Sequence, residues 1–238
     1  MNMAKSVAFI TGANKGIGLE TARQLGRAGL TVVLGARDEA RGSAAVAALA
    51  SQGLDAHLAV VDVNSEAQVA KLPGYFREKH GRLDVLVNNA GVAVWGKGDV
   101  ASFRATFETN VFGVVSVTYA LLPLLRESPA GRIVNLSSIL GSLGTIEKNP
   151  DMFGDHLDPA YTASKAALNG FTVALANKLR GTPIKVNSAH PGWVKTDLGG
   201  AGAPMEITDG AKTAVRLATL PESGPTGQFF HMNDRLPW

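Results

Sequence analysis

The feature that most constrains the fold is an alternation of short apolar segments with longer amphipathic segments along the whole chain. The short segments are rich in Val, Ile and Leu and are almost continuously apolar, as is typical of parallel strands covered on both faces. They predict strands at 7–10, 31–34, 56–60, 85–87, 132–136 and 185–188, with a less distinct one at 227–230.

The segments between these strands predict helices at 17–28, 39–50, 66–79, 103–126 and 161–179. Strand, helix and strand in this repeated order require right-handed crossovers, which produce a parallel sheet with helices on both faces. No linker, internal repeat or shift in composition divides the chain. We therefore predict one α/β domain over residues 1–238, doubly wound, with a mainly parallel sheet of about seven strands.

The composition excludes several kinds of chemistry. The chain has no cysteine, which removes disulfides, thiolate catalysis and cysteine-based metal sites, and we expect no metal. The net charge of +3 is spread along the chain without a basic run, so we expect no nucleic-acid or membrane partner. No secretory signal pattern is present at the N-terminus, and a cytoplasmic location is the default expectation.

A glycine-rich turn leads from the first strand into the first helix, with the sequence Thr-Gly-Ala-Asn-Lys-Gly-Ile-Gly at 11–18. Glycines allow a tight corner and the close approach of a pyrophosphate, and the helix N-terminus supplies free N–H groups. The turn predicts a dinucleotide site made by Gly12, Asn14, Lys15, Gly16, Ile17 and Gly18. A purely structural glycine turn is the alternative.

The end of the second strand favours NADP(H) over NAD(H). The position at which an NAD-selective site places a carboxylate is Ala36, and Arg37 follows it directly. The guanidinium of Arg37 is suited to a 2′-phosphate, and Lys15 is placed to reach the same group. The alternative is that both cations are ordinary surface charges and that Asp38 pairs with Arg37.

Candidate catalytic groups follow later strands. Ser137 and Ser138 follow the fifth strand, and Tyr161 and Lys165 share one face of the last long helix. Carbonyl reduction needs a proton for the oxygen as well as a hydride for the carbon. A neighbouring ammonium lowers the pKa of a tyrosine, and a serine hydroxyl can bind the oxygen on which charge develops.

Three further motifs accompany these residues in order. An Asn-Asn-Ala-Gly turn ends the fourth strand at 88–91, a lone Asn110 lies in an apolar helical stretch, and Pro-Gly-Trp-Val-Lys-Thr follows the sixth strand at 191–196. A buried asparagine satisfied within the core is the alternative for Asn110. A structural role is the preferred interpretation of His190, since the Tyr–Lys pair makes another acid or base unnecessary.

Together these motifs resemble the short-chain dehydrogenase/reductase family, and most of all its NADPH-dependent carbonyl reductases. The resemblance implies a Rossmann domain in which Tyr161 donates the proton, Ser138 binds the carbonyl oxygen, Lys165 tunes Tyr161 and holds the nicotinamide ribose, and Asn110 organises a water. It also implies NADP(H) contacts from further residues: Asp62, Val63, Asn88, Ala90, Gly91, Pro191, Gly192, Val194 and Thr196.

The chain departs from the family pattern at two places. The gap between Ser138 and Tyr161 is longer than usual, and the C-terminal ten residues lack the usual Asp-Gly-Gly tail. We call residues 139–160 the substrate segment, and it is predicted to be a loop beside the site. Whether it is a lid or blocks an interface stays open, as does the choice between a monomer and a homo-oligomer.

The expected substrate is a small carbonyl compound contacted by Ser138, Tyr161 and Trp193. An apolar wall of Leu140, Met152, Phe153 and Trp193 suits bulky ketones, although aromatic residues filling the core explain the same sequence equally well. Two other functions stay open at this stage. One is an alcohol or steroid dehydrogenase working oxidatively, and the other is an NADP(H)-sensing protein without turnover.

Overall fold

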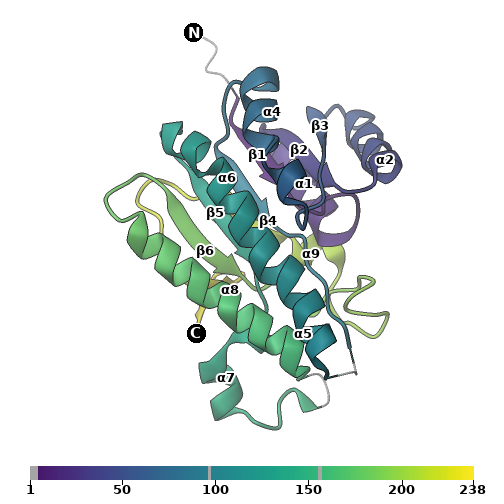
Figure 1. The fold of residues 1–238 in the computed structure, drawn as a ribbon, viewed down its shortest axis with the longest axis vertical. Coiled ribbons are helices and arrows are strands. Elements are labelled where there is room, and N and C mark those ends of the chain that lie inside the picture. The colour runs from purple at the N-terminus through teal and green to yellow at the C-terminus, as the bar shows by residue number, and fades with distance from the viewer. Residues whose placement is uncertain (1–4, 96–97, 155–156) are drawn as a thin grey trace.

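The computed structural model describes residues 5–95, 98–154 and 157–238 (Figure 1). Its strands form one eight-stranded sheet in the order β3-β2-β1-β4-β5-β6-β7-β8. The strands are β1 (Val7–Ile10), β2 (Thr31–Ala36), β3 (Ala56–Val60), β4 (Val85–Asn88), β5 (Arg132–Leu136), β6 (Lys185–Ala189), β7 (Phe229–His231) and β8 (Asp234–Leu236). All neighbours pair in parallel except β7 and β8. The predicted doubly wound sheet is confirmed, with the C-terminal β8 as an additional strand.

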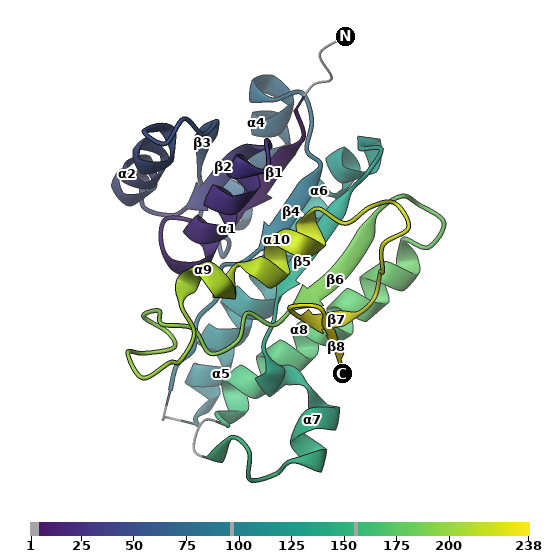
Figure 2. The same cartoon turned by 180° about the vertical axis from the view of Figure 1, so that it is seen from behind.

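Helices cover both faces of this sheet. They are α1 (Gly16–Arg27), α2 (Glu39–Ala50), α3 (Glu66–Val69), α4 (Leu72–Lys79), α5 (Val100–Phe107), α6 (Val114–Glu127), α7 (Leu143–Lys148), α8 (Pro159–Lys178), α9 (Ile207–Gly210) and α10 (Lys212–Ala218). Figure 1 shows α4, α6 and α8 on one face, and Figure 2 shows α1, α2 and α10 on the other.

The helix boundaries correct the sequence expectations in three places. The helix predicted at 66–79 is two helices, because Pro73 lies in the first turn of α4 and cannot continue a helix. The long helix predicted at 103–126 begins at Val100 and contains a π-helical segment, Glu108–Gly113. The substrate segment, of which residues 155 and 156 lie outside the described residues, is not a plain loop, since it contains a 3₁₀ turn (Ile139–Gly141) and α7.

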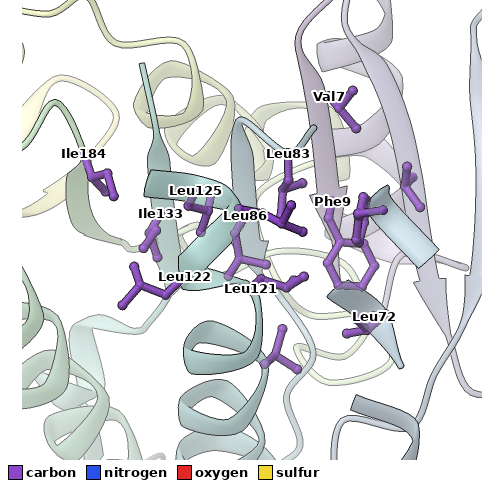
Figure 3. Close-up of a cluster of buried hydrophobic side chains, with 14 of the residues drawn as sticks. Val7, Phe9, Leu72, Leu83, Leu86, Leu121, Leu122, Leu125, Ile133 and Ile184 are labelled. Atoms are coloured by element: carbon purple, nitrogen blue, oxygen red, sulfur yellow. The ribbon is translucent and has the colours of Figure 1, made fainter. Parts of the chain in front are cut away.

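Alternating side chains of the buried strands build two cores. In β1, Val7 and Phe9 join the core under α4, α6 and α8, whereas Ala8 and Ile10 join the core under α1, α2 and α10. Figure 3 shows part of the first of these cores, with Phe9 among Leu72, Leu86 and Leu121. The rings of Phe9 and Phe76 pack edge to face in this core, with centroids 5.2 Å apart. Each large apolar side chain buried in this way contributes about 1.5–3 kcal/mol.

The run from α5 to α6 is long and apolar enough to cross a membrane by length and composition. In the described part of the chain it is the one such run, and its buried side is part of the sheet core, through Val117, Leu121 and Leu125. The run therefore packs as a core helix.

The sheet order places a ligand site at one edge. Strand order reverses between β1 and β4, and the helices that follow these two strands, α1 and α6, pack in the cores on opposite faces. Ligands of doubly wound sheets bind at the carboxyl ends of the strands at this switch point. Every motif singled out in the sequence follows a strand or lies at this edge.

Candidate active site

The glycine turn after β1 is joined to the Asn-Asn-Ala-Gly turn after β4. The Thr11 hydroxyl accepts hydrogen bonds from the N–H groups of Asn89 and Ala90, both at 3.0 Å. The Asn89 side chain donates to the carbonyls of Thr11 at 2.8 Å and Gly12 at 3.1 Å. Gly18 is required by this contact, because a Cβ there would lie 2.3 Å from Asn89 Nδ2.

The start of α1 fits a pyrophosphate. Gly12 and Gly16 adopt φ values of 62° and 59°, which favour glycine, and a Cβ on Gly12 would lie 3.0 Å from the Ala90 backbone. Lys15 is the N-cap residue and its side chain makes no capping bond to the first amides of the helix. Uncapped N–H groups at a helix N-terminus form an anion site.

The two predicted phosphate cations are placed differently. Arg37 directly follows β2 and is exposed, and the preceding strand end offers the buried Ala36 rather than a carboxylate. Asp38 caps α2 by accepting from the Arg41 N–H at 2.9 Å and is ion-paired with Arg41. The alternative pairing of Asp38 with Arg37 is therefore not the arrangement found.

Lys15 forms an ion pair with Asp197, which belongs to the loop after β6. Lys15 lowers the pKa of Asp197 through a hydrogen bond and through its charge. Both side chains are largely exposed. This ion pair connects the glycine turn at 11–18 to the loop that contains Thr196. The two segments also lie close together at Gly16, where a Cβ would be 3.7 Å from the Thr196 methyl group.

Several predicted cofactor residues lie together beside the switch point, around an interior gap too small to hold a water molecule. Its lining includes Val63 after β3 and Ala90 after β4, with Thr11, Asn88, Thr109, Gly113 and Val114. Asp62 lies next to Val63 and accepts a hydrogen bond from the Asn64 N–H at 3.0 Å. Gly91 comes close to Lys165, since a Cβ there would lie 3.6 Å from Lys165 Nζ.

Asn88 has an internal role beyond the one expected from the sequence. Its side chain is buried and donates to Thr118 Oγ1 at 3.0 Å and to Asn135 Oδ1 at 2.9 Å. Asn135 in turn donates to Thr172 Oγ1 on α8 at 2.8 Å. The Asn88 side chain thus connects β4 to β5 and to the helices behind them, and its NH₂ group is taken up by this network.

Ser138, Tyr161 and Lys165 meet at the carboxyl edge of the sheet. Their exposed fractions are 8%, 7% and 5%, and Lys165 Nζ lies 5.5 Å from the centroid of the Tyr161 ring. The ammonium donates to the Leu136 carbonyl at 2.8 Å, at the end of β5. The shared face of Tyr161 and Lys165 on α8 follows from their spacing of four residues.

Burial dominates the electrostatics of this group. It raises the pKa of Tyr161 to about 12, and a hydrogen bond with the Ser138 side chain acts in the opposite direction. Burial also lowers the pKa of Lys165 to about 8. The sequence argument expected the ammonium to lower the pKa of Tyr161 below its ordinary value. The pKa of Tyr161 is instead raised, because desolvation of the phenolate outweighs the hydrogen bond with Ser138.

Asn110 lies in the π-helical segment and is fully buried. Its side chain accepts from the Val92 N–H at 2.9 Å and donates to the Val92 carbonyl at 2.9 Å and to Ser164 Oγ at 3.0 Å. These bonds tie the turn after β4 to α8 one residue before Lys165. The side chain is thus a positioning group, and π-helical turns of this kind are frequent at functional sites.

The loop after β6 is folded on itself beside the site. Gly192 has φ 93° and packs against Met205, while Val194 is buried and pairs with Met205 in a parallel bridge. Thr196 Oγ1 accepts from the Gly199 N–H at 3.1 Å. Pro191 starts this loop and is half-buried. The predicted nicotinamide residues therefore belong to one ordered loop.

His190 has the structural role that the sequence argument preferred. Its Nδ1 accepts from the Ile139 N–H at 3.2 Å and lies 3.4 Å from the Gly192 nitrogen. Burial and the charge of His231 lower the pKa of His190 to about 3, so its imidazole is neutral. It joins the backbone after Ser138 to the loop after β6.

Two residues beside Tyr161 were not singled out from the sequence. Asp158 caps α8 by accepting from the Tyr161 N–H at 2.9 Å, and the Asp-Pro pair at 158–159 is the signal that reveals this helix start. Trp95, which is 45% exposed, packs against Tyr161 with ring centroids 5.4 Å apart. No periodic pattern marks Trp95, because it lies in a loop.

The predicted apolar wall is placed as follows. Met152 and Trp193 are exposed, and Leu140 and Phe153 are half-buried. Trp193 Nε1 donates to the Gly199 carbonyl at 2.8 Å, which fixes the indole on its loop. None of these four side chains fills the main cores, which argues against the core-filling alternative. Within the described residues, no cluster of three His, Asp or Glu side chains is arranged to hold a metal ion.

A family model described as short chain dehydrogenase matches residues 6–206. The chain belongs to the short-chain dehydrogenase/reductase family. This confirms the resemblance that the motifs gave. Carbonyl reductase (NADPH) 1 of Mus musculus is 35% identical to this family member, over 100% of both chains. Short-chain dehydrogenase/reductase 1 of Saponaria officinalis is 34% identical, over 98% of this chain and 96% of its own.

Solved structures give the same assignment. Salutaridine reductase of Papaver somniferum superimposes with a TM-score of 0.84 at 30% identity, over 95% of this chain and 99% of its own. An NADPH-bound carbonyl reductase from chicken fatty liver superimposes with a TM-score of 0.85 at 26% identity, over 99% of both chains. The fold and the family of this dehydrogenase/reductase are therefore established together.

Proposed function

We propose that this protein is an NADPH-dependent carbonyl reductase. The observation that carries the proposal is the buried group of Ser138, Tyr161 and Lys165, which lies beside a glycine turn with uncapped helix amides. The similarity to carbonyl reductases supports it. NADPH would supply the hydride, and the chain supplies the proton and holds the carbonyl oxygen.

Each of the four predicted catalytic residues has a separate role in this reaction. Ser138 donates a hydrogen bond to the carbonyl oxygen, and Tyr161 transfers its proton there as charge develops. Lys165 in its protonated form stabilises the phenolate left on Tyr161, and it holds the nicotinamide ribose. A raised Tyr161 pKa suits a donor that stays protonated until the oxygen becomes basic. Asn110 fixes the turn and the helix between which a proton path would run.

The rest of the cofactor would lie along the carboxyl edge of the sheet. Glycine-turn amides bind the pyrophosphate, Arg37 takes the 2′-phosphate with Lys15, and Asp62 and Val63 flank the adenine. The loop at 191–196 would hold the nicotinamide carboxamide. At the end of β2, Ala36 stands where an NAD-selective site places a carboxylate and Arg37 follows it directly, which favours NADPH over NADH.

The test is loss of NADPH absorbance with a panel of aldehydes, aryl ketones, keto esters and diketones, run beside NADH. We expect turnover with NADPH that disappears in Tyr161→Phe. Preference for NADH would remove the roles given to Arg37 and Lys15. Faster alcohol oxidation than ketone reduction at neutral pH would favour the oxidative dehydrogenase, and NADPH binding without turnover would favour a sensor.

A further inference from the structure

The substrate segment is attached at its base to the C-terminal end of the chain. Ser142 is fully buried, and its hydroxyl donates to the Pro237 carbonyl at 2.8 Å while it accepts from the Thr145 N–H at 3.2 Å. The Gly144 N–H donates to the backbone oxygen of Trp238 at 2.7 Å. The first turn of α7 is therefore held by the backbone of residues 237–238.

These two residues are themselves held firmly. They follow the antiparallel pair of β7 and β8, and the Trp238 ring stacks on the buried Phe229 with centroids 5.8 Å apart and planes 12° apart. At the hairpin turn, Arg216 donates to the Met232 carbonyl at 2.8 Å. Figure 2 shows the C-terminus beside β7 and β8 and close to α7. We call residues 229–238 the C-terminal hairpin.

The other end of the same stretch touches the catalytic group. Ser138 Oγ accepts from the Leu140 N–H at 3.2 Å. Gly141 packs so closely on α8 that a Cβ there would lie 2.6 Å from the Lys165 carbonyl carbon. Its carbonyl accepts from Asn169 at 3.0 Å. Residues 138–145 thus connect Ser138 to the C-terminal hairpin, with hydrogen bonds at Ser138, Gly141 and Ser142.

We propose that the C-terminal hairpin positions the substrate segment and thereby sets which carbonyl compounds fit beside Ser138. The inference rests on the proposed function for its kinetic consequence. The hairpin bonds fix the base of α7, while Leu143 on this helix is 62% exposed and Met152 beyond it is 66% exposed. In this proposal the exposed apolar side chains contact the distal part of a large substrate, whereas a small substrate held at Ser138 does not reach them. Ser142 and Gly144 are therefore positioning residues for specificity.

The experiment compares three variants with a matched control. Ser142→Ala removes the bond to Pro237, and Ser142→Thr keeps a hydroxyl. In Gly144→Ala the new Cβ would lie 3.0 Å from the Trp238 carbonyl oxygen and so acts as a wedge. The control is Ser128→Ala, which removes a buried serine hydrogen bond to Asp84 at the opposite edge of the sheet.

We expect Ser142→Ala and Gly144→Ala to raise KM for a bulky aryl ketone by about fivefold to tenfold, the loss corresponding to one hydrogen bond. KM for a small aldehyde, kcat and the Kd for NADPH should stay close to those of the wild type. Ser142→Thr should restore the ketone KM, and Ser128→Ala should not change it. Equal changes for both substrates, or the same change in Ser128→Ala, would overturn the proposal.

Amide hydrogen exchange gives a readout without turnover. Exchange in residues 143–148 should accelerate in Ser142→Ala and in Trp238→Ala, which loses the stacking on Phe229, and should be unchanged in Ser128→Ala. Unchanged exchange in the first two variants would overturn the positioning role. If the wild type reduced no carbonyl compound, the proposed function would fail while this measurement still decided whether the hairpin holds α7.

Discussion

Ionisable side chains are buried at both ends of the parallel strands, which we call the amino edge and the carboxyl edge of the sheet. The two edges differ in the number of hydrogen bonds that these side chains receive. At the amino edge, the Asp84 carboxylate accepts from the Val7 N–H at 2.9 Å, from Arg82 at 2.8 and 2.6 Å and from the Ser128 hydroxyl at 2.6 Å. At the carboxyl edge, Tyr161 has a hydrogen bond with Ser138 and Lys165 donates to the Leu136 carbonyl, yet burial raises the pKa of Tyr161 and lowers that of Lys165.

The difference separates a structural site from a reactive one. A buried carboxylate that receives several hydrogen bonds holds the segments that donate them together, and the loss of a partner there costs stability. Burial disfavours the charged forms of Tyr161 and Lys165 and moves the pKa of Lys165 toward neutrality, and groups with perturbed pKa values cluster at functional sites. Changes at the amino edge should therefore alter stability, and changes at the carboxyl edge should alter chemistry.

The largest expected effect is on chemistry. Tyr161→Phe removes the proton donor and should lower kcat for ketone reduction by about 10²–10⁴-fold. The free energy of unfolding should stay within about 1 kcal/mol of the wild type, because only one hydroxyl and its bond to Ser138 are lost. Steady-state kinetics and urea unfolding measure the two quantities. Substantial residual turnover would remove Tyr161 from the proposed mechanism.

Asp84→Asn should produce the opposite pattern. It replaces an acceptor oxygen with a donor group facing Arg82 and Ser128, and the free energy of unfolding should fall by about 3 kcal/mol. Turnover per folded molecule should be unchanged. The control is Glu127→Gln at the exposed pair with Arg77, which should cost at most about 1 kcal/mol. Similar losses in the two variants would contradict the distinction drawn here.

Lys165 should link pH to both chemistry and stability. Its pKa is lowered to about 8, so kcat/KM for NADPH in the reductive direction should decline as pH rises through that value and the ammonium is lost. Tyr161, with a pKa of about 12, stays protonated across this range. Lys165→Arg keeps the charge and should remove the decline. A decline that persists in this variant would assign it to another group.

The lowered pKa of Lys165 also predicts that its buried ammonium destabilises the folded protein at neutral pH. Between pH 8 and the ordinary lysine value of 10.5, the unfolded chain binds the proton that the folded chain has lost, so the stability of the fold rises with pH there. At neutral pH the buried ammonium is unfavourable. Lys165→Met should therefore abolish reduction and raise the free energy of unfolding by about 1–3 kcal/mol. Urea unfolding at pH 7 measures this, and a destabilised variant would contradict it.

The smallest expected effect concerns Lys15. Asp197→Asn releases Lys15 from its ion pair, and the freed ammonium should tighten NADPH binding by about twofold to fivefold at low salt, as for an exposed pair. Binding of NADH should change less, because it lacks the 2′-phosphate. Fluorescence titration of both cofactors gives the comparison. Equal tightening for both would place Lys15 at the pyrophosphate instead.

Much of the fold and of the site is predictable from the sequence for a physical reason. Buried parallel strands must be almost continuously apolar, and a pyrophosphate turn must use glycines, so β1, α1 and the turn at 11–18 are visible without coordinates. The helical spacing of four residues likewise brings Tyr161 and Lys165 together. These features depend on short-range geometry, which the local sequence contains.

Only the tertiary structure decides which distant segments meet. The sequence does not show that Lys15 pairs with Asp197, which is 182 positions away, or that Ser142 is held by Pro237, which is 95 positions away. It does not show that Asn88 is occupied by an internal network, or that burial reverses the expected shift in the pKa of Tyr161. Each of these depends on packing that encloses a side chain from several elements, and no local pattern encodes that enclosure.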